Sequence, residues 1–381
     1  MTPIRIGMTT LGADGGRSGI GTYVIQLLRE FEGMAPAAQV DVVSLPSERD
    51  AFAPAPSRLA HIPARPPAAG PIPELLWHQT GLRALAQANR WDALFLPAAN
   101  RRLSVSAPCP TIGTVHDLAS RHLPEKYDPV RSWYNRRLIP RLIRRLAAVI
   151  TVSECSKRDI VAASHIDQDR VVVIPNGVDH RRFRPRDAAR SAARLTGRYG
   201  LTGPFILYVA RLEHPGKNHV RLVEAFDRFR RRTGLPHQLV LAGPDWSGAE
   251  QIHAAIRSTG CPEAIRTPGF VAAGDLPDLY AAADLLAFPS LYEGFGLPVL
   301  EAMAMGTPVA CSRRASLPEV AGDAAVYFEP DDPADIADAM EAALQSREAL
   351  RTKGLARSAA FTWRRTAEQT LHVITRTLQH A

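Results

Sequence analysis

Twelve short apolar runs rich in β-branched residues alternate with helix-like segments along this chain of 381 residues. PIRIGMTT, near the start, and FILYVAR, in the second half, are examples. Apolar strands that alternate with helices are typical of parallel sheets covered on both faces. Twelve strands exceed what one open twisted sheet usually holds. The pattern therefore predicts an α/β fold with two doubly wound, Rossmann-like domains.

The polar, charged segment 176–190 carries no apolar period and separates the two halves. We therefore expect an N-terminal domain over residues 1–180 and a C-terminal domain over residues 181–362. A final helix, at about residues 363–379, follows the last predicted strand. Segment 51–73 contains seven prolines, a density that predicts a long surface loop in the first domain.

Composition narrows the classes of function. No apolar run approaches the roughly 18 residues that span a bilayer, and the N-terminus resembles a strand rather than a signal peptide, so we expect a cytoplasmic protein. The four cysteines share no CxxC spacing, which argues against a zinc site or a disulfide framework. A net charge of +8 suits anionic substrates, an anionic membrane or nucleic acid. No nucleic-acid-binding module is recognisable, so no nucleic-acid partner is expected.

The segment 283–312 carries the strongest chemical signal. A predicted strand is followed by a loop with Gly294 and Gly296, and Pro298 marks the start of a helix. Backbone N–H groups at the N-terminus of a helix bind anions. We therefore expect the amides of Gly296 and Leu297 to face a phosphate.

Two carboxylates flank this loop: Glu293 lies within it, and Glu301 is expected in the first helical turn. Carboxylates accept hydrogen bonds from sugar hydroxyls, so a phosphate site between them suits a nucleotide sugar. The alternative is an ordinary strand-to-helix turn in which Glu301 only favours the helix dipole.

The segment PSLYEGFGLPVLEAMA, with Glu293 and Glu301 in an E-x7-E spacing, resembles the signature of family-4-type retaining glycosyltransferases with the GT-B fold. A second segment, RLEHPGKN, is similar to the family's G/S-R-x5-K-N motif, with Ala210 at the small position before Arg211. Two cations at the end of a strand, Arg211 and Lys217, suit a diphosphate; a surface ion-pair loop is the alternative. The resemblance covers essentially the whole chain and is weakest over residues 29–89.

Weaker signals lie at other predicted strand ends. The loop SGIGTYV contains Gly19, which matches a family glycine that closes over the donor phosphate. His116 ends strand TIGTV, and the resemblance places it against the donor sugar; a packed, hydrogen-bonded histidine is the alternative. Phe270 and Val271 match the position that lines the nucleobase, and an ordinary strand end is the alternative.

The resemblance implies two domains that face a cleft and transfer a hexose, with retention, from a nucleotide diphosphate sugar to a saccharide or lipid-linked saccharide. It assigns Glu301 to the ribose, and Glu293 and His116 to the sugar. Bacterial mannosyltransferases of polysaccharide biosynthesis are similar, which favours GDP-mannose as donor. No clustered Asp-x-Asp is placed to hold Mg²⁺, so we expect neither a metal nor a cofactor.

Other activities fit the same residues. A nucleotide-sugar epimerase or a sugar phosphorylase on the same fold, and a non-catalytic sugar-nucleotide binding protein, are the alternatives.

Residues 131–148, RSWYNRRLIPRLIRRLAA, place arginines among aromatic and aliphatic residues at helical spacing, and Pro140 predicts an interruption. One hypothesis is a helix that lies on an anionic membrane surface. The alternative is an apolar face packed on the sheet with the arginines in water.

Overall fold

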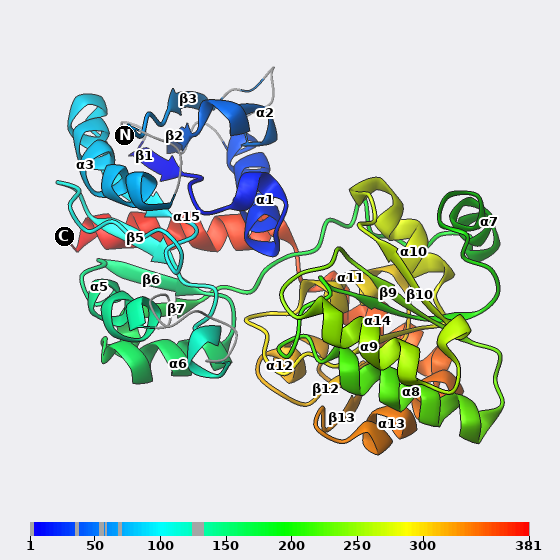
Figure 1. Ribbon diagram of the computed structural model, residues 1–381. Helices are drawn as coiled ribbons and strands as arrows, with labels where there is room; N and C mark the ends of the chain where they lie inside the picture. The colour runs from blue at the N-terminus through cyan, green and yellow to red at the C-terminus, as the bar shows by residue number, and fades with distance from the viewer. Residues whose placement is uncertain are drawn as a thin grey trace. The chain divides into compact units, whose positions relative to one another are not determined.

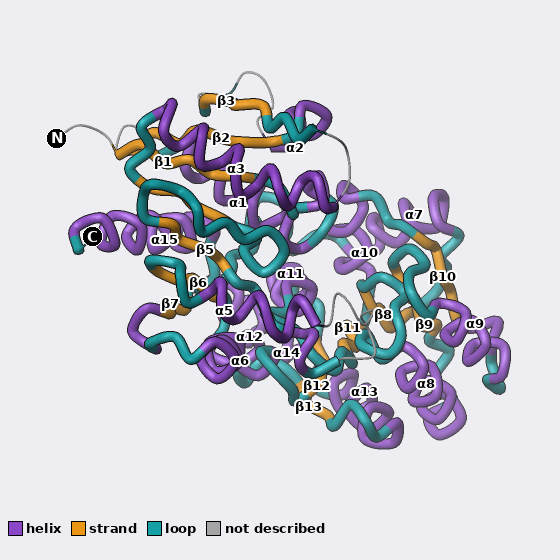
Figure 2. Tube along the Cα trace, turned by 60° about the vertical axis from the view of Figure 1, so that its left-hand side comes forward, coloured by secondary structure: helices purple, strands orange, loops and turns teal. Residues whose placement is uncertain are grey.

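The computed structural model describes residues 4–34, 38–52, 57, 59–67, 71–123 and 133–380. It divides into two compact units, Met1–Gly177 with Trp363–Ala381, and Val178–Thr362. Each unit is a parallel β-sheet with helices packed around it, as Figures 1 and 2 show. The predicted α/β fold with two doubly wound sheets is confirmed.

The first unit is built on a seven-stranded sheet in the order β3-β2-β1-β4-β5-β6-β7. Its strands are β1 (Ile4–Thr9), β2 (Ala38–Ser44), β3 (Ala60–Pro63), β4 (Ala93–Leu96), β5 (Thr111–Thr114), β6 (Ala148–Thr151) and β7 (Val171–Val173). Its helices are α1 (Gly19–Glu32), α2 (Arg49–Phe52), α3 (Pro71–Asn89), α5 (Ile139–Ile143), α6 (Glu154–Ser164) and α15 (Trp363–Gln379). The central strands β4, β5 and β6 are buried throughout, which explains the apolar sequences of β4 and β6.

The prediction of a long surface loop over residues 51–73 is wrong in part. Strand β3 lies inside this segment and pairs in parallel with β2, from Asp41 opposite Ala60 to Ser44 opposite Pro63. A proline is tolerated there because β3 is the edge strand and Pro63 is its last residue. Pro54 and Pro56 lie outside the described residues.

The second unit holds a six-stranded sheet in the order β10-β9-β8-β11-β12-β13. Its strands are β8 (Phe205–Val209), β9 (Gln238–Ala242), β10 (Ile265–Gly269), β11 (Leu285–Phe288), β12 (Val309–Ser312) and β13 (Val326–Phe328). Its helices are α7 (Ala188–Tyr199), α8 (His219–Thr233), α9 (Ala249–Ser258), α10 (Leu276–Ala282), α11 (Leu297–Met305), α12 (Leu317–Ala321), α13 (Pro333–Gln345) and α14 (Arg347–Ala359). Helices α8 and α13 pack side by side (Figure 2).

The last helix, α15, has the bounds that the sequence predicts and belongs to the first unit. It packs against α1 and β6 (Figure 1). The Thr366 hydroxyl donates a hydrogen bond of 2.8 Å to the Pro175 carbonyl, and the Trp363 ring lies 6.1 Å from the Tyr23 ring. Among the described helices, none is both long and apolar enough to span a bilayer.

The strand order reverses once in each sheet. In the first unit the chain goes from β1 to β2 on one side and returns to β4 on the other; in the second it goes from β8 to β9 and returns to β11. Ligands of open α/β sheets bind beyond the carboxyl ends of the strands at such a switch point. We therefore expect ligand-binding residues in the loops after β1, β4, β8 and β11.

Candidate active site

An ion pair spans the switch point of the second sheet. Lys217 follows β8, Glu293 follows β11, and Lys217 Nζ lies 2.6 Å from Glu293 Oε1. Both side chains are about four-fifths buried, with exposed fractions of 21% and 17%. Because the pair sits where the strand order reverses, the two residues that the sequence assigned to phosphate and sugar are brought together.

Buried polar groups fix the backbone beneath this pair. The Tyr208 hydroxyl, on β8, donates to the Lys217 carbonyl at 2.8 Å and lies 3.0 Å from Ser290 Oγ. The Asn218 amide donates to the carbonyls of Pro289, at 3.1 Å, and Pro330, at 2.7 Å. These bonds join the loops after β8, β11 and β13, so the position of Lys217 is set by three strands.

The glycine loop before α11 is held by a serine. The Ser316 hydroxyl lies 2.9 Å from the carbonyl oxygens of both Glu293 and Phe295. Gly296 has φ of 104°, a left-handed conformation that favours glycine, and a Cβ there would lie 2.7 Å from Leu317 Cδ2. Helix α11 begins at Leu297, one residue before Pro298. In the described part of the chain, the amides of Gly296 and Leu297 have no acceptor, so they can donate to an anion.

Glu301 lies further along α11 than predicted. It is the fifth residue of a helix that starts at Leu297, so it belongs to the second turn rather than the first. Its carboxylate accepts a hydrogen bond of 2.9 Å from the Tyr280 hydroxyl. Burial raises the pKa of Glu301 to about 7, against the opposing effects of this hydrogen bond and of Arg182. Because burial makes the charged form of Glu301 unfavourable, hydrogen bonds donated by hydroxyl groups of a ligand would stabilise that charged form.

Arg211, which follows β8, is held between an acid and an aromatic ring. Its Nη2 lies 3.0 Å from Glu213 Oε2, and its guanidinium lies 4.6 Å from the centre of the Trp246 ring. Trp246, which follows the neighbouring strand β9, is 54% exposed although it is a large apolar residue. The stacked guanidinium therefore stays at the carboxyl edge of the sheet, with its free edge open to solvent.

The predicted nucleobase residues differ in exposure. Phe270, directly after β10, is 68% exposed, whereas the side chain of Val271 is buried. Strand β10 is separated from β8 by β9, so Phe270 lies two strands away from the strand that carries Arg211. Phe270 is free to contact a ligand, and the Val271 side chain is not.

In the first unit, His116 follows β5 and is buried. Its Nε2 lies 2.8 Å from the Pro97 carbonyl, and its ring meets the Tyr23 ring edge-on at 4.8 Å. Since a carbonyl only accepts, Nε2 carries the proton. Burial lowers the pKa of His116 to about 4, so the imidazole is neutral at pH 7. His116 is thus packed and hydrogen-bonded through Nε2, and its contact with a donor sugar stays a prediction.

Gly19, the first residue of α1, is the other predicted residue of this unit. The Ser18 hydroxyl caps the helix by accepting from the Gly21 amide at 3.2 Å. Gly21 packs closely on backbone, because a Cβ there would lie 2.6 Å from Gly16 Cα. Gly21 is thus explained by packing, and Gly19 opens the helix at the carboxyl end of β1.

Sequence reasoning missed Tyr208, Ser316 and Trp246. Tyr208 reads as an ordinary strand residue, and Ser316 contributes only through contacts with residues more than twenty positions earlier. Trp246 had a usable signal: it is a bulky aromatic residue in the loop that follows a predicted strand, where polar residues and glycine are usual.

Comparison with known proteins agrees with this geometry. Residues 198–354 match the family model of group 1 glycosyl transferases, and residues 17–182 match that of glycosyltransferase family 4. O-antigen chain mannosyltransferase B of Escherichia coli is 33% identical over 267 residues, which are 68% of this chain and 69% of that protein. The chain is a family-4-type glycosyltransferase.

Two further similarities show how much of the chain and of its relatives is shared. The serotype-specific mannosyltransferase WbdA of Escherichia coli is 33% identical over 284 residues, but the match covers only 34% of WbdA and 72% of this glycosyltransferase. The chain thus spans about a third of that relative's length. HepE of Anabaena, solved in complex with UDP and glucose, covers 98% of this chain and 100% of its own, with a TM-score of 0.77 and 18% identity. The predicted GT-B fold is confirmed.

Proposed function

We propose that this glycosyltransferase moves a hexose, with retention of configuration, from a nucleoside diphosphate sugar to a saccharide or lipid-linked saccharide. The observation that carries the proposal is the Lys217–Glu293 pair at the switch point, next to the open amides of Gly296 and Leu297. A cation, a carboxylate and a helix N-terminus in one place suit a phosphate attached to a polyhydroxylated ring.

Charge on the departing diphosphate is the main electrostatic demand of such a reaction. As the bond between the sugar and the β-phosphate breaks, negative charge grows on the phosphate oxygens. Arg211, Lys217 and the α11 amides would stabilise that charge, usually the largest catalytic effect in sites of this kind. Because protein cations serve the diphosphate, we propose that transfer needs no metal and no cofactor.

Glu293 is proposed to accept hydrogen bonds from sugar hydroxyls while Lys217 holds its carboxylate. Retaining glycosidases instead use two carboxylates roughly 5 Å apart, one of them a nucleophile. Glu301 is assigned to the ribose hydroxyls, so it does not complete such a pair. The acceptor would attack the face from which the phosphate leaves, without a covalent intermediate.

His116 is proposed to orient the donor sugar. A pKa of about 4 makes the imidazole neutral, so it does not act as a general acid at pH 7. With Nε2–H committed to Pro97, Nδ1 is the ring nitrogen left to accept a hydrogen bond. The Ser156 hydroxyl donates to the His116 carbonyl at 3.0 Å and fixes the backbone of the strand end.

For the donor we propose GDP-mannose, since two relatives are named mannosyltransferases. A UDP-sugar is the second candidate, because HepE was solved with UDP and glucose. A panel of GDP-, UDP-, ADP- and dTDP-sugars in thermal unfolding decides between them, since a ligand that binds the folded state raises its stability. A rise only with GDP-mannose supports the proposal; a rise only with a UDP-sugar replaces the donor.

Product analysis tests the reaction itself. Incubation with donor, acceptor and EDTA should give a glycoside whose anomeric configuration, by NMR, is that of the donor. An epimerised donor without acceptor would indicate an epimerase, release of a sugar phosphate with inorganic phosphate a phosphorylase, and binding without turnover a non-catalytic protein. An inverted product or strict Mg²⁺ dependence contradicts the retaining, metal-independent reaction.

We place this reaction in the cytoplasm, as a step of polysaccharide assembly. The proposal follows from the need for nucleotide sugars as donors and from the O-antigen transferase named among the relatives.

A further inference from the structure

The structure describes the basic segment 131–148 from Trp133 onward, and Arg131 lies outside the described residues. It forms a π-helix, Tyr134–Leu138, that leads into α5. Pro140 explains the wide turn, because proline has no N–H to donate and its ring displaces the carbonyl four residues earlier. The interruption predicted at Pro140 is therefore present.

The apolar side of this segment is not available to a membrane. Ile139, Ile143 and Leu146 are buried in the core of the first unit, with Tyr134 and Leu142 packed against them. The packing alternative therefore describes the apolar residues, while contact of the arginines with an anionic membrane surface stays a prediction. What faces solvent is a row of arginines with one aromatic residue.

We define the arginine surface as Trp133 with Arg136, Arg137, Arg141, Arg144 and Arg145. All six side chains are exposed, and Trp133 is 61% exposed. In the part of the chain that the structure describes, no carboxylate lies within ion-pair distance of these five guanidinium groups. Five positive charges, none paired with a described carboxylate, therefore lie close together in sequence, three of them on the helical stretch and two in the turn after α5.

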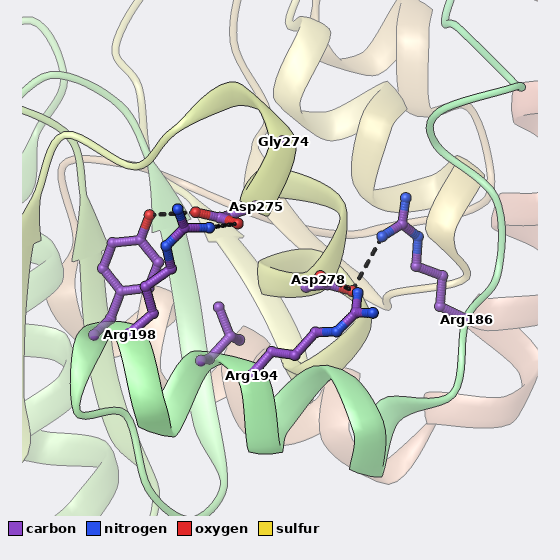
Figure 3. Close-up of a pocket in the computed structure, with 8 residues that line it drawn as sticks. Arg186, Arg194, Arg198, Gly274, Asp275 and Asp278 are labelled. Carbon is purple, nitrogen blue, oxygen red and sulfur yellow. Dashed lines mark hydrogen bonds and ion pairs between the residues drawn. The ribbon is translucent and has the colours of Figure 1, made fainter.

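An arginine cluster of the second unit is, by contrast, largely neutralised. Figure 3 shows a cavity of the second unit lined by arginines from α7 and the segment before it. There Arg186 and Arg194 lie 3.1 and 3.2 Å from the two oxygens of Asp278, and Arg198 lies 2.6 Å from Asp275. These ion pairs hold α7 and the segment before it against α10. A high arginine content therefore does not by itself leave arginine side chains without an acidic partner.

We propose that the arginine surface docks the protein on an anionic lipid bilayer, by electrostatic attraction with Trp133 as an interfacial anchor. Guanidinium groups pair with lipid phosphates, and tryptophan favours the depth of the headgroups. A single-stranded nucleic acid would be met by several aromatic residues along a groove, whereas the arginine surface carries one. The proposal goes beyond the transfer reaction and does not depend on which donor is used.

Vesicle flotation of the whole chain tests whether the arginine surface docks on anionic lipid. The vesicles contain equal parts of phosphatidylcholine and phosphatidylglycerol, with pure phosphatidylcholine as the neutral comparison. Each arginine near an anionic membrane multiplies the partition coefficient by about fivefold, so Arg136→Gln/Arg137→Gln/Arg141→Gln should lower it about 100-fold. Wild-type binding should need the anionic lipid and fall as salt rises from about 0.05 M to about 0.5 M.

A matched triple variant in the second unit separates the effect of the arginine surface from the effect of net charge. Arg184, Arg190 and Arg266 are exposed and make no ion pair with a described residue. Their replacement by glutamine removes the same charge and should leave flotation near the wild-type level. Trp133→Ala should weaken binding severalfold while its salt dependence remains. Circular dichroism confirms that each variant is folded.

Three results overturn the proposal. They are equal loss of binding in the two triple variants, equal binding to neutral and anionic vesicles, and retention on duplex DNA without flotation on anionic vesicles.

Discussion

Lys217 and Glu293 are 76 residues apart in sequence, yet Lys217 Nζ lies 2.6 Å from Glu293 Oε1 at the switch point of the second sheet. The pair links the two motifs from which the family was recognised. A lysine whose partner is a carboxylate on the opposite loop is already aligned before any donor binds. That alignment reduces the reorganisation needed to stabilise charge on a diphosphate.

Replacement of Lys217 by alanine should reduce kcat/KM by roughly 100- to 1000-fold, or about 2.7–4 kcal/mol of transition-state stabilisation. The reason is the loss of one cation from the phosphate site together with the release of Glu293. Steady-state kinetics with the best donor measure the effect. Lys353, an exposed lysine paired with Asp323, provides the matched control: Lys353→Ala should keep wild-type turnover. Near-normal activity of a folded Lys217→Ala variant would remove Lys217 from the site.

The ionised carboxylate of Glu301 should lower the stability of the folded protein at neutral pH. Its pKa is about 7 in the folded state against an ordinary 4.5. Between pH 4.5 and about pH 7 the folded chain holds more protons than the unfolded chain. The stability of the fold therefore falls as the pH rises through this window. Glu301→Gln should therefore have a higher Tm than wild type at pH 8, and the difference should shrink below about pH 4.5.

The same substitution should weaken donor binding. A neutral amide accepts hydrogen bonds from ribose hydroxyls less strongly than a carboxylate, by about tenfold in Kd. Glu224→Gln changes an exposed carboxylate and should show neither effect. A Glu301→Gln variant that binds the donor normally contradicts the ribose assignment, whereas an unchanged Tm profile contradicts the raised pKa.

The fold was predictable because most strands are buried on both faces and their sequences show it. Strand β3 was not, since an edge strand needs little apolar pattern and AHIP lies among prolines. Within the site, Arg211, Lys217 and Glu293 follow strands, a position that sequence can identify. Trp246 also follows a strand, but its contact with Arg211 could not be predicted, because that contact depends on the pairing of β8 with β9.

Trp246 should affect donor affinity more than turnover. Its ring holds the Arg211 guanidinium at 4.6 Å, an exposed cation–π contact that is worth about 0.5–1 kcal/mol. Trp246→Ala should raise the KM for the donor about two- to fivefold with little change in kcat, and Trp246→Phe should restore most of it. Trp133→Ala, in the first unit, is the control for loss of an exposed tryptophan. A fall in kcat with unchanged KM, not rescued by phenylalanine, would argue against this positioning role.

Gly296 should be the glycine of the site least tolerant of a side chain. Its φ of 104° is unfavourable for alanine, and the added Cβ would lie 2.7 Å from Leu317 Cδ2. Gly296→Ala should lower stability by about 1–3 kcal/mol and shift the amides of Gly296 and Leu297 away from the phosphate. Denaturant unfolding measures the first effect, and donor titration the second.

Two further variants separate the collision from the backbone strain at Gly296. Leu317→Ala, added to Gly296→Ala, removes the atom that the Cβ would meet but leaves the left-handed backbone. The double variant should therefore recover only part of the donor affinity. Gly274→Ala has no atom within 4 Å of its Cβ and no positive φ, so it should match wild type in both measurements. Full donor affinity in Gly296→Ala would mean that the conformation of this loop does not present the α11 amides to the diphosphate, and the anion site would then have to rest on Arg211 and Lys217 alone.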